Sequence, residues 1–85
     1  MEEAWNHIGD HYSERHRWDE AVTYFEKARN IEKLVKCYYA LEDYHSLESL
    51  VDVMQPNDPL LEQLGGLFAS VGMGKQAVEA YIKVI

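Results

Sequence analysis

The sequence predicts an all-α fold, a TPR-like (tetratricopeptide-like) α-solenoid segment of three antiparallel helical hairpins with six helices. Three observations predict it: a helical-hairpin signature opens the chain, the signature returns twice, and no stretch alternates in the manner of a strand. We expect a single repeat domain over residues 1–85. The members of the opening signature are Trp5, Ile8, Gly9, Tyr12, Ala21, Phe25 and Ala28.

The two later copies align with the first without internal gaps. A shift of 26 residues carries Ile8 to Leu34, and a shift of 56 carries it to Leu64. The second copy retains Leu34, Tyr38, Tyr44 and Leu47. The third retains Leu64, Gly65, Phe68, Gly74, Ala77 and Tyr81.

The first hairpin is expected over about residues 3–29. Its first helix runs to about residue 16, because the apolar members of the signature follow helical spacing. Its second helix begins at Trp18 or Asp19 and ends near Arg29. Acidic residues near its start and basic residues near its end have the charge order that the helix dipole favours.

The second hairpin is expected over about residues 31–54, with helices at 31–41 and 44–54. No Pro or Gly marks the boundary with the preceding helix, and Asp43 is a candidate N-cap for the second of the two. Val35 stands where the other copies have Gly, and Leu47 replaces a small Ala. We therefore expect this hairpin to be more open than the other two.

The third hairpin is expected over about residues 59–85, after a loop at 55–59. Asp58 is the predicted N-cap and Pro59 the first helical residue, where a missing N–H is harmless. Gly72 predicts a left-handed stop before the last helix. That last helix is expected to bury Ala77, Val78, Tyr81 and Ile82.

The repeated residues are predicted to pack helices together rather than to bind a ligand. Helices that cross about 8 Å apart need small residues at the crossing, which Gly9, Gly65 and the alanines supply. Large aromatic rings then fill the remaining space. This role is assigned to Trp5, Ile8, Gly9, Tyr12, Ala21, Phe25, Ala28, Leu34, Tyr38, Leu47, Leu64, Gly65, Phe68, Ala77 and Tyr81. No surface is assigned to a partner.

Composition limits the partners and the compartment. A net charge of -7 argues against nucleic acid and anionic lipid, which require a surplus of Lys and Arg. No apolar run is long enough to insert into a membrane, and the single cysteine fits the cytoplasm. The last apolar helix has no stop signal, so we expect a segment of a longer protein that self-associates through exposed terminal helices.

Three features invite a chemical interpretation, and none supports an enzyme, a cofactor or a metal. His7 and His11 have a chelating spacing, but they flank the apolar stripe and lack the H-E-x-x-H pattern. Cys37 has no established His partner and is expected to be a small apolar residue. Residues 65–75 lack the first Gly and the final Ser or Thr of a phosphate-binding loop.

Charge is uneven along the chain. No Lys or Arg occurs between Cys37 and Gly74, a stretch that carries six acidic side chains. An ordinary solvated face explains this pattern, and an acidic surface that docks a basic partner segment is the sharper alternative.

Several strings are more specific than the repeat spacing. Residues 4–10 read AWNHIGD, residues 37–39 read CYY, residues 41–44 read LEDY, residues 71–73 read VGM, and residues 76–78 read QAV. With Trp18 and the Ala-Val pair at 21–22, these strings resemble the C-terminal helical region of the WD repeat-containing protein 35 family. The resemblance extends over nearly all 85 residues.

The resemblance implies a function for the parent protein. Members of that family are subunits of intraflagellar transport complex A, with WD40 propellers followed by a long α-solenoid. It implies a non-enzymatic scaffold that assembles with the other subunits, supports retrograde transport and passage of membrane proteins into cilia, and is found in cytoplasm, cilium, basal body and axoneme. A peptide-binding tetratricopeptide adaptor and a vesicle-coat-like solenoid subunit remain the alternatives.

Overall fold

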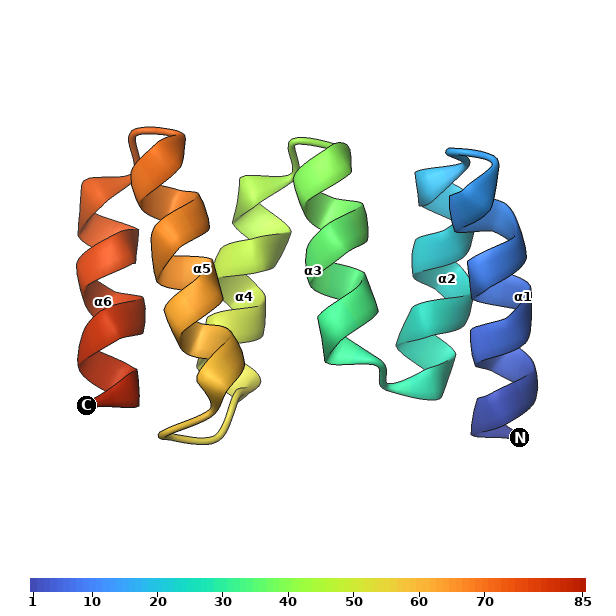
Figure 1. The fold of residues 1–85 in the computed structure, drawn as a ribbon, viewed down its shortest axis with the longest axis horizontal. Coiled ribbons are helices and arrows are strands. Elements are labelled where there is room, and N and C mark those ends of the chain that lie inside the picture. The colour runs from blue at the N-terminus through green and yellow to red at the C-terminus, as the bar shows by residue number, and fades with distance from the viewer. The chain divides into compact units, whose positions relative to one another are not determined.

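A computed structural model describes residues 1–85, which form six helices and no strand (Figure 1). The predicted all-α class with six helices is confirmed. None of the helices has the length and apolar character that crossing a membrane requires. The helices are α1 (Glu2–Glu14), α2 (Trp18–Ala28), α3 (Ile31–Ala40), α4 (Tyr44–Val53), α5 (Pro59–Ser70) and α6 (Gly74–Val84).

The helices divide into two compact units, Met1–Asp43 with α1, α2 and α3, and Tyr44–Ile85 with α4, α5 and α6. The boundary falls inside the middle hairpin predicted over residues 31–54, and that hairpin stays a prediction. The other two predicted hairpins each lie within one unit. In Figure 1, α2 runs antiparallel to α1, and α6 runs antiparallel to α5.

One turn geometry recurs at the end of α1, α3 and α5. In each case a backbone N–H donates to the carbonyl five residues earlier, closing the last helical turn. The three donor–acceptor pairs are Arg17 to Tyr12 at 2.9 Å, Asp43 to Tyr38 at 2.9 Å and Met73 to Phe68 at 2.8 Å. The three acceptors stand at the aromatic position of the three sequence copies. The turn therefore recurs at the same shifts of 26 and 56 residues as the sequence signature.

The residue that reverses the chain in each of these turns is left-handed. His16, Glu42 and Gly72 have φ values of 58°, 58° and 83°. The positions are related by the shifts of 26 and 56 that relate the copies. Only the third copy has glycine, for which this conformation is unstrained. The turn also ends α1 at Glu14, two residues before the predicted end.

The first unit is a hairpin with α3 packed on α2. Ala21 and Phe25 of α2 are fully buried, and Leu34 and Cys37 of α3 are buried as well. Asn30 is the N-cap of α3, and its side chain accepts from the Lys33 N–H at 3.1 Å. Asn30 therefore marks the boundary between the second and third helices, where the sequence has neither Pro nor Gly.

The second unit is a hairpin with α4 packed on α5. Leu61, Leu64 and Phe68 of α5 are almost completely buried, together with the small Ala80 of α6. The Asp58 side chain accepts from the Leu60 N–H at 3.0 Å, so the predicted N-cap is confirmed. Pro59 follows as the first residue of α5, also as predicted.

The burial predicted for α6 is partly wrong. Ala77 is buried, but Val78 and Ile82 are 56% and 65% exposed, and Tyr81 is 39% exposed. Helical spacing identifies an apolar stripe, but it does not say whether another helix covers that stripe. On α6, part of the stripe faces solvent.

Candidate functional site

Both complete hairpins are held by a glycine against an aromatic ring. A Cβ atom on Gly9 would lie 2.6 Å from the Phe25 ring, and one on Gly65 would lie 2.7 Å from the Tyr81 ring. Real Cβ atoms do not approach carbon atoms so closely, so only glycine admits each ring at the crossing. The rings differ in one respect, because Phe25 is fully buried and Tyr81 is 39% exposed.

A stack of three rings lies along α1 and α2, and we call Trp5, Tyr12 and Tyr24 the aromatic ladder. Tyr24 lies between the other two, with centroid distances of 5.9 Å to Trp5 and 5.6 Å to Tyr12. A cation lies at each end, Lys27 at 5.3 Å from the Trp5 centroid and Arg17 at 5.8 Å from that of Tyr12. All three rings are half-buried, so they combine apolar area with contacts to exposed cations.

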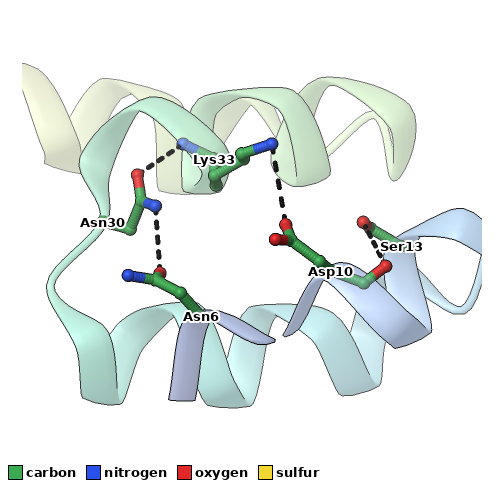
Figure 2. Close-up of polar contacts among 5 residues, drawn as sticks. All are labelled: Asn6, Asp10, Ser13, Asn30 and Lys33. Carbon is green, nitrogen blue, oxygen red and sulfur yellow. Dashed lines mark hydrogen bonds and ion pairs between the residues drawn. The ribbon is translucent and has the colours of Figure 1, made fainter. Parts of the chain in front are cut away.

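Polar side chains connect α1 to the start of α3 (Figure 2). The Asn30 side-chain amide donates to Asn6 Oδ1 at 3.0 Å, and Lys33 Nζ lies 3.6 Å from Asp10 Oδ1. Ser13 Oγ donates to the Asp10 carbonyl at 3.1 Å. The ion pair is partly solvated, so it stabilises little by itself and mainly orients the two side chains.

An open cleft of about 450 Å³ lies beside this polar cluster, and its lining carries both signs of charge. His16 and Trp18 stack at its edge, with ring centroids 5.5 Å apart. Its lining residues are Asp10, Ser13, Glu14, His16, Trp18, Lys33 and Lys36.

In the second unit a lysine of α6 closes the end of α4. Lys83 Nζ donates to the Val51 carbonyl at 2.6 Å and lies 3.3 Å from the Asp52 carbonyl. The last carbonyls of a helix have no partner within the helix and form the negative end of its dipole. The ammonium group therefore both satisfies these carbonyls and ties α4 to α6.

His11 and Cys37, which were weighed for chemistry, have different surroundings, since the first is exposed and the second is buried. No group of three or more His, Cys, Asp or Glu side chains is placed to hold a metal ion. His11 Nδ1 lies 3.1 Å from Arg15 Nη1. Burial raises the pKa of the Cys37 thiol, and Lys36 and Lys33 only partly oppose this, so the thiol stays protonated and poorly nucleophilic near neutral pH.

The residues predicted to pack the repeats occupy two kinds of environment. Ten are buried: Gly9, Ala21, Phe25, Ala28, Leu34, Leu47, Leu64, Gly65, Phe68 and Ala77. Trp5, Ile8, Tyr12 and Tyr38 are half-buried, and Tyr81 is exposed on one side. Trp5 and Tyr12 of the half-buried group belong to the aromatic ladder.

Sequence reasoning missed the polar contacts. Lys27 and Lys83 stand at equivalent positions, since a shift of 56 carries one to the other, and this repetition was a readable signal. Asn30 has the residue type and position of an N-cap. Its bond to Asn6 had no local signal, because the two residues are 24 apart in the chain.

Three mammalian proteins are similar to almost the whole chain. WD repeat-containing protein 35 of Rattus norvegicus is 46% identical over 83 residues, and those of Mus musculus and Homo sapiens are 45% identical over 83 residues. The match covers 98% of this chain but only 7% of the length of each relative. No protein-family profile matches the chain. The family that the sequence strings indicated is confirmed for this segment.

Proposed function

We propose, from the homology of this chain to a segment of WD repeat-containing protein 35, that it is a non-enzymatic scaffold segment of an intraflagellar transport complex A subunit. It contributes stacked helical hairpins to assembly of the complex. Through that complex it supports retrograde ciliary transport and passage of membrane proteins into the cilium. Its partners are the other complex A subunits, and it works in the cytoplasm, cilium, basal body and axoneme.

Sequence identity to WD repeat-containing protein 35 carries this proposal, and the repeated crossing of glycine and aromatic ring supports its scaffold part. The crossings of Gly9 with Phe25 and of Gly65 with Tyr81 have the same geometry in two separate units. Repeats of this kind bury their apolar faces on neighbours and leave the remaining surfaces to partners.

The cleft beside α1 and α3 favours a second candidate, a peptide-binding tetratricopeptide module. Lys33 and Lys36 line this cleft and supply donors, as recognition of an extended acidic peptide requires. Asp10 and Glu14 line the same cleft and oppose such a peptide. The scaffold role therefore remains the better supported of the two.

Pull-down of the chain against each complex A subunit, expressed singly, tests the proposal. We expect at least one subunit to be retained by the folded chain and lost with Gly9→Leu, which disrupts the first hairpin. Lys33→Glu should leave this retention unchanged. Failure of the folded chain to retain any subunit would overturn the scaffold proposal, and binding of an acidic peptide that Lys33→Glu abolishes would favour the adaptor.

A further inference from the structure

Two polar contacts form a seam between α1 and α3 in the first unit (Figure 2). The Asn30 amide donates to Asn6 Oδ1 at 3.0 Å, and Lys33 Nζ lies 3.6 Å from Asp10 Oδ1. Residue numbers rise on both helices from the first contact to the second, so α1 and α3 run parallel along the seam. The second contact is therefore about one helical turn beyond the first on each helix.

One turn further along, the seam is open. Glu14 follows Asp10 by four residues and Lys36 follows Lys33 by three, so these two side chains are the next pair of opposite charges. No ion pair joins them, and neither has another ion-pair partner. Both are exposed, and both line the open cleft of about 450 Å³. The cleft thus holds one unpaired charge of each sign.

An aromatic edge adjoins these charges. Trp18 is half-buried and lines the cleft, and the His16 ring stacks on it with centroids 5.5 Å apart. The edge is fixed by the left-handed turn at His16, which the Arg17 N–H closes on the Tyr12 carbonyl at 2.9 Å. A guanidinium group suits such surroundings, because it stacks on aromatic rings and pairs with a carboxylate through two N–H groups.

The charges select the kind of segment that the cleft can bind. A wholly acidic segment would pair with Lys36 but would meet Glu14, and a wholly basic segment would have the reverse problem. Removing water from a charge that stays unpaired costs more than an exposed ion pair returns. A segment with both signs of charge leaves neither side chain unpaired.

We propose that this cleft binds a partner segment in which an arginine and a carboxylate side chain lie close together, with the arginine at Glu14 and Trp18 and the carboxylate at Lys36. Every lining residue lies between Asp10 and Lys36, within the first unit, so the site is complete in that unit. Lys33 stays paired with Asp10 and closes the seam below the segment. The proposal goes beyond the scaffold role, because it assigns a recognition site to one surface.

An NMR titration of the isotope-labelled chain tests the proposal. The readouts are the indole N–H of Trp18 and the backbone amides of Glu14 and Lys36. The probes are four capped peptides of equal length in a Gly-Ser background, carrying an arginine and an aspartate, a lysine and an aspartate, two aspartates, or two arginines.

The peptide with arginine and aspartate should shift these signals in a saturable manner. The lysine version should bind about threefold more weakly, because an ammonium group stacks less well on the indole ring. The two single-sign peptides should bind about tenfold more weakly or less. Equal or tighter binding of the peptide with two aspartates would overturn the proposal in favour of the acidic-peptide adaptor. Absence of binding by the mixed peptide would show an ordinary solvated surface and would overturn it as well.

Charge reversals change the preferred peptide. Lys36→Glu leaves two unpaired acids in the cleft, so it should lose the mixed peptide by about tenfold and gain the peptide with two arginines. Glu14→Lys should instead gain the peptide with two aspartates. Both residues are exposed, so both variants should fold, which circular dichroism checks. A reversal that leaves the preference unchanged would contradict the assigned contacts.

Two matched controls separate the cleft from net charge. Lys75→Glu and Glu79→Lys make the same changes in charge at exposed residues of the second unit, so both should bind the mixed peptide as the wild type does. A control that matches the effect of its counterpart in the cleft would overturn the proposal. Retention of complex A subunits is measured separately, so failure of the peptide titration leaves the scaffold role standing.

Discussion

The hairpins α1–α2 and α5–α6 share one register and differ in what surrounds them. The same glycine crossing and the same left-handed turn occur in both. Leu61 and the small Ala80 are fully buried in the second hairpin, whereas their equivalents Trp5 and Tyr24 are half-buried in the first. The comparison teaches that the repeat signature specifies the hairpin, whereas the size and burial of the side chains around it differ from one hairpin to the other.

The glycine crossings should give the largest difference between the two hairpins. Gly9→Ala is expected to destabilise the first unit by about 2 kcal/mol, because the buried Phe25 ring cannot move aside. Gly65→Ala should be nearly neutral, because Tyr81 can swing toward solvent and alanine improves helix propensity by about 1 kcal/mol. Urea unfolding followed by circular dichroism measures both, and tryptophan fluorescence isolates the first unit, which holds both tryptophans. Equal losses of unfolding free energy in the two variants would show that exposure of the facing ring does not determine the cost of the added methyl group.

Substitutions of the equivalent residues Lys27 and Lys83 should differ less in their effect on the free energy of unfolding than those of the two glycines. Lys83→Met removes the donor to the Val51 carbonyl and is expected to destabilise the second unit by about 1.5 kcal/mol. Lys27→Met removes only an exposed contact with the Trp5 ring and should cost about 0.5 kcal/mol. Both values are compared by urea unfolding of the monomer at low concentration. A larger loss for Lys27→Met would contradict the assignment of Lys83 as the cap of α4.

The turns offer a smaller, stabilising change. Glu42→Gly is expected to raise stability by about 1 kcal/mol, because a left-handed φ of 58° strains a residue with a side chain and suits glycine. His16→Gly should gain less, because it also removes the stacking of His16 on Trp18. Thermal unfolding of both variants measures the two gains. A lower melting temperature for Glu42→Gly would mean that its side chain stabilises the turn more than the strain destabilises it.

The smallest effect concerns alkaline pH and the first unit. Burial raises the pKa of the Cys37 thiol above its ordinary value of 9.0, so the unfolded chain loses this proton first as pH rises. Stability is therefore fully present below about pH 9 and declines above it. Tyr38, whose pKa is also raised by burial, extends the decline to higher pH.

Urea unfolding between about pH 8 and 11 measures this decline. Cys37→Ala should flatten its first part, and Tyr38→Phe the later part. Tyr39→Phe is the matched control, because Tyr39 is 41% exposed. An unchanged slope in both Cys37→Ala and Tyr38→Phe would rule out these groups as its source.

The sequence alone determined the helices, the register of the copies and the family of the segment. The Asp58–Pro59 start, the Gly72 stop and the glycine crossings follow from local rules, because caps, turns and helical spacing involve residues close in the chain. The same spacing was wrong about the burial of Val78 and Ile82.

Only the tertiary structure decided which faces are covered. The pattern of a helix says which stripe is apolar, but burial depends on whether a second helix lies opposite that stripe. The same holds for Lys83, whose acceptor on α4 is 32 residues away in sequence. The sequence therefore could not show that Lys27 lies over an aromatic ring whereas Lys83 donates to the end of a helix.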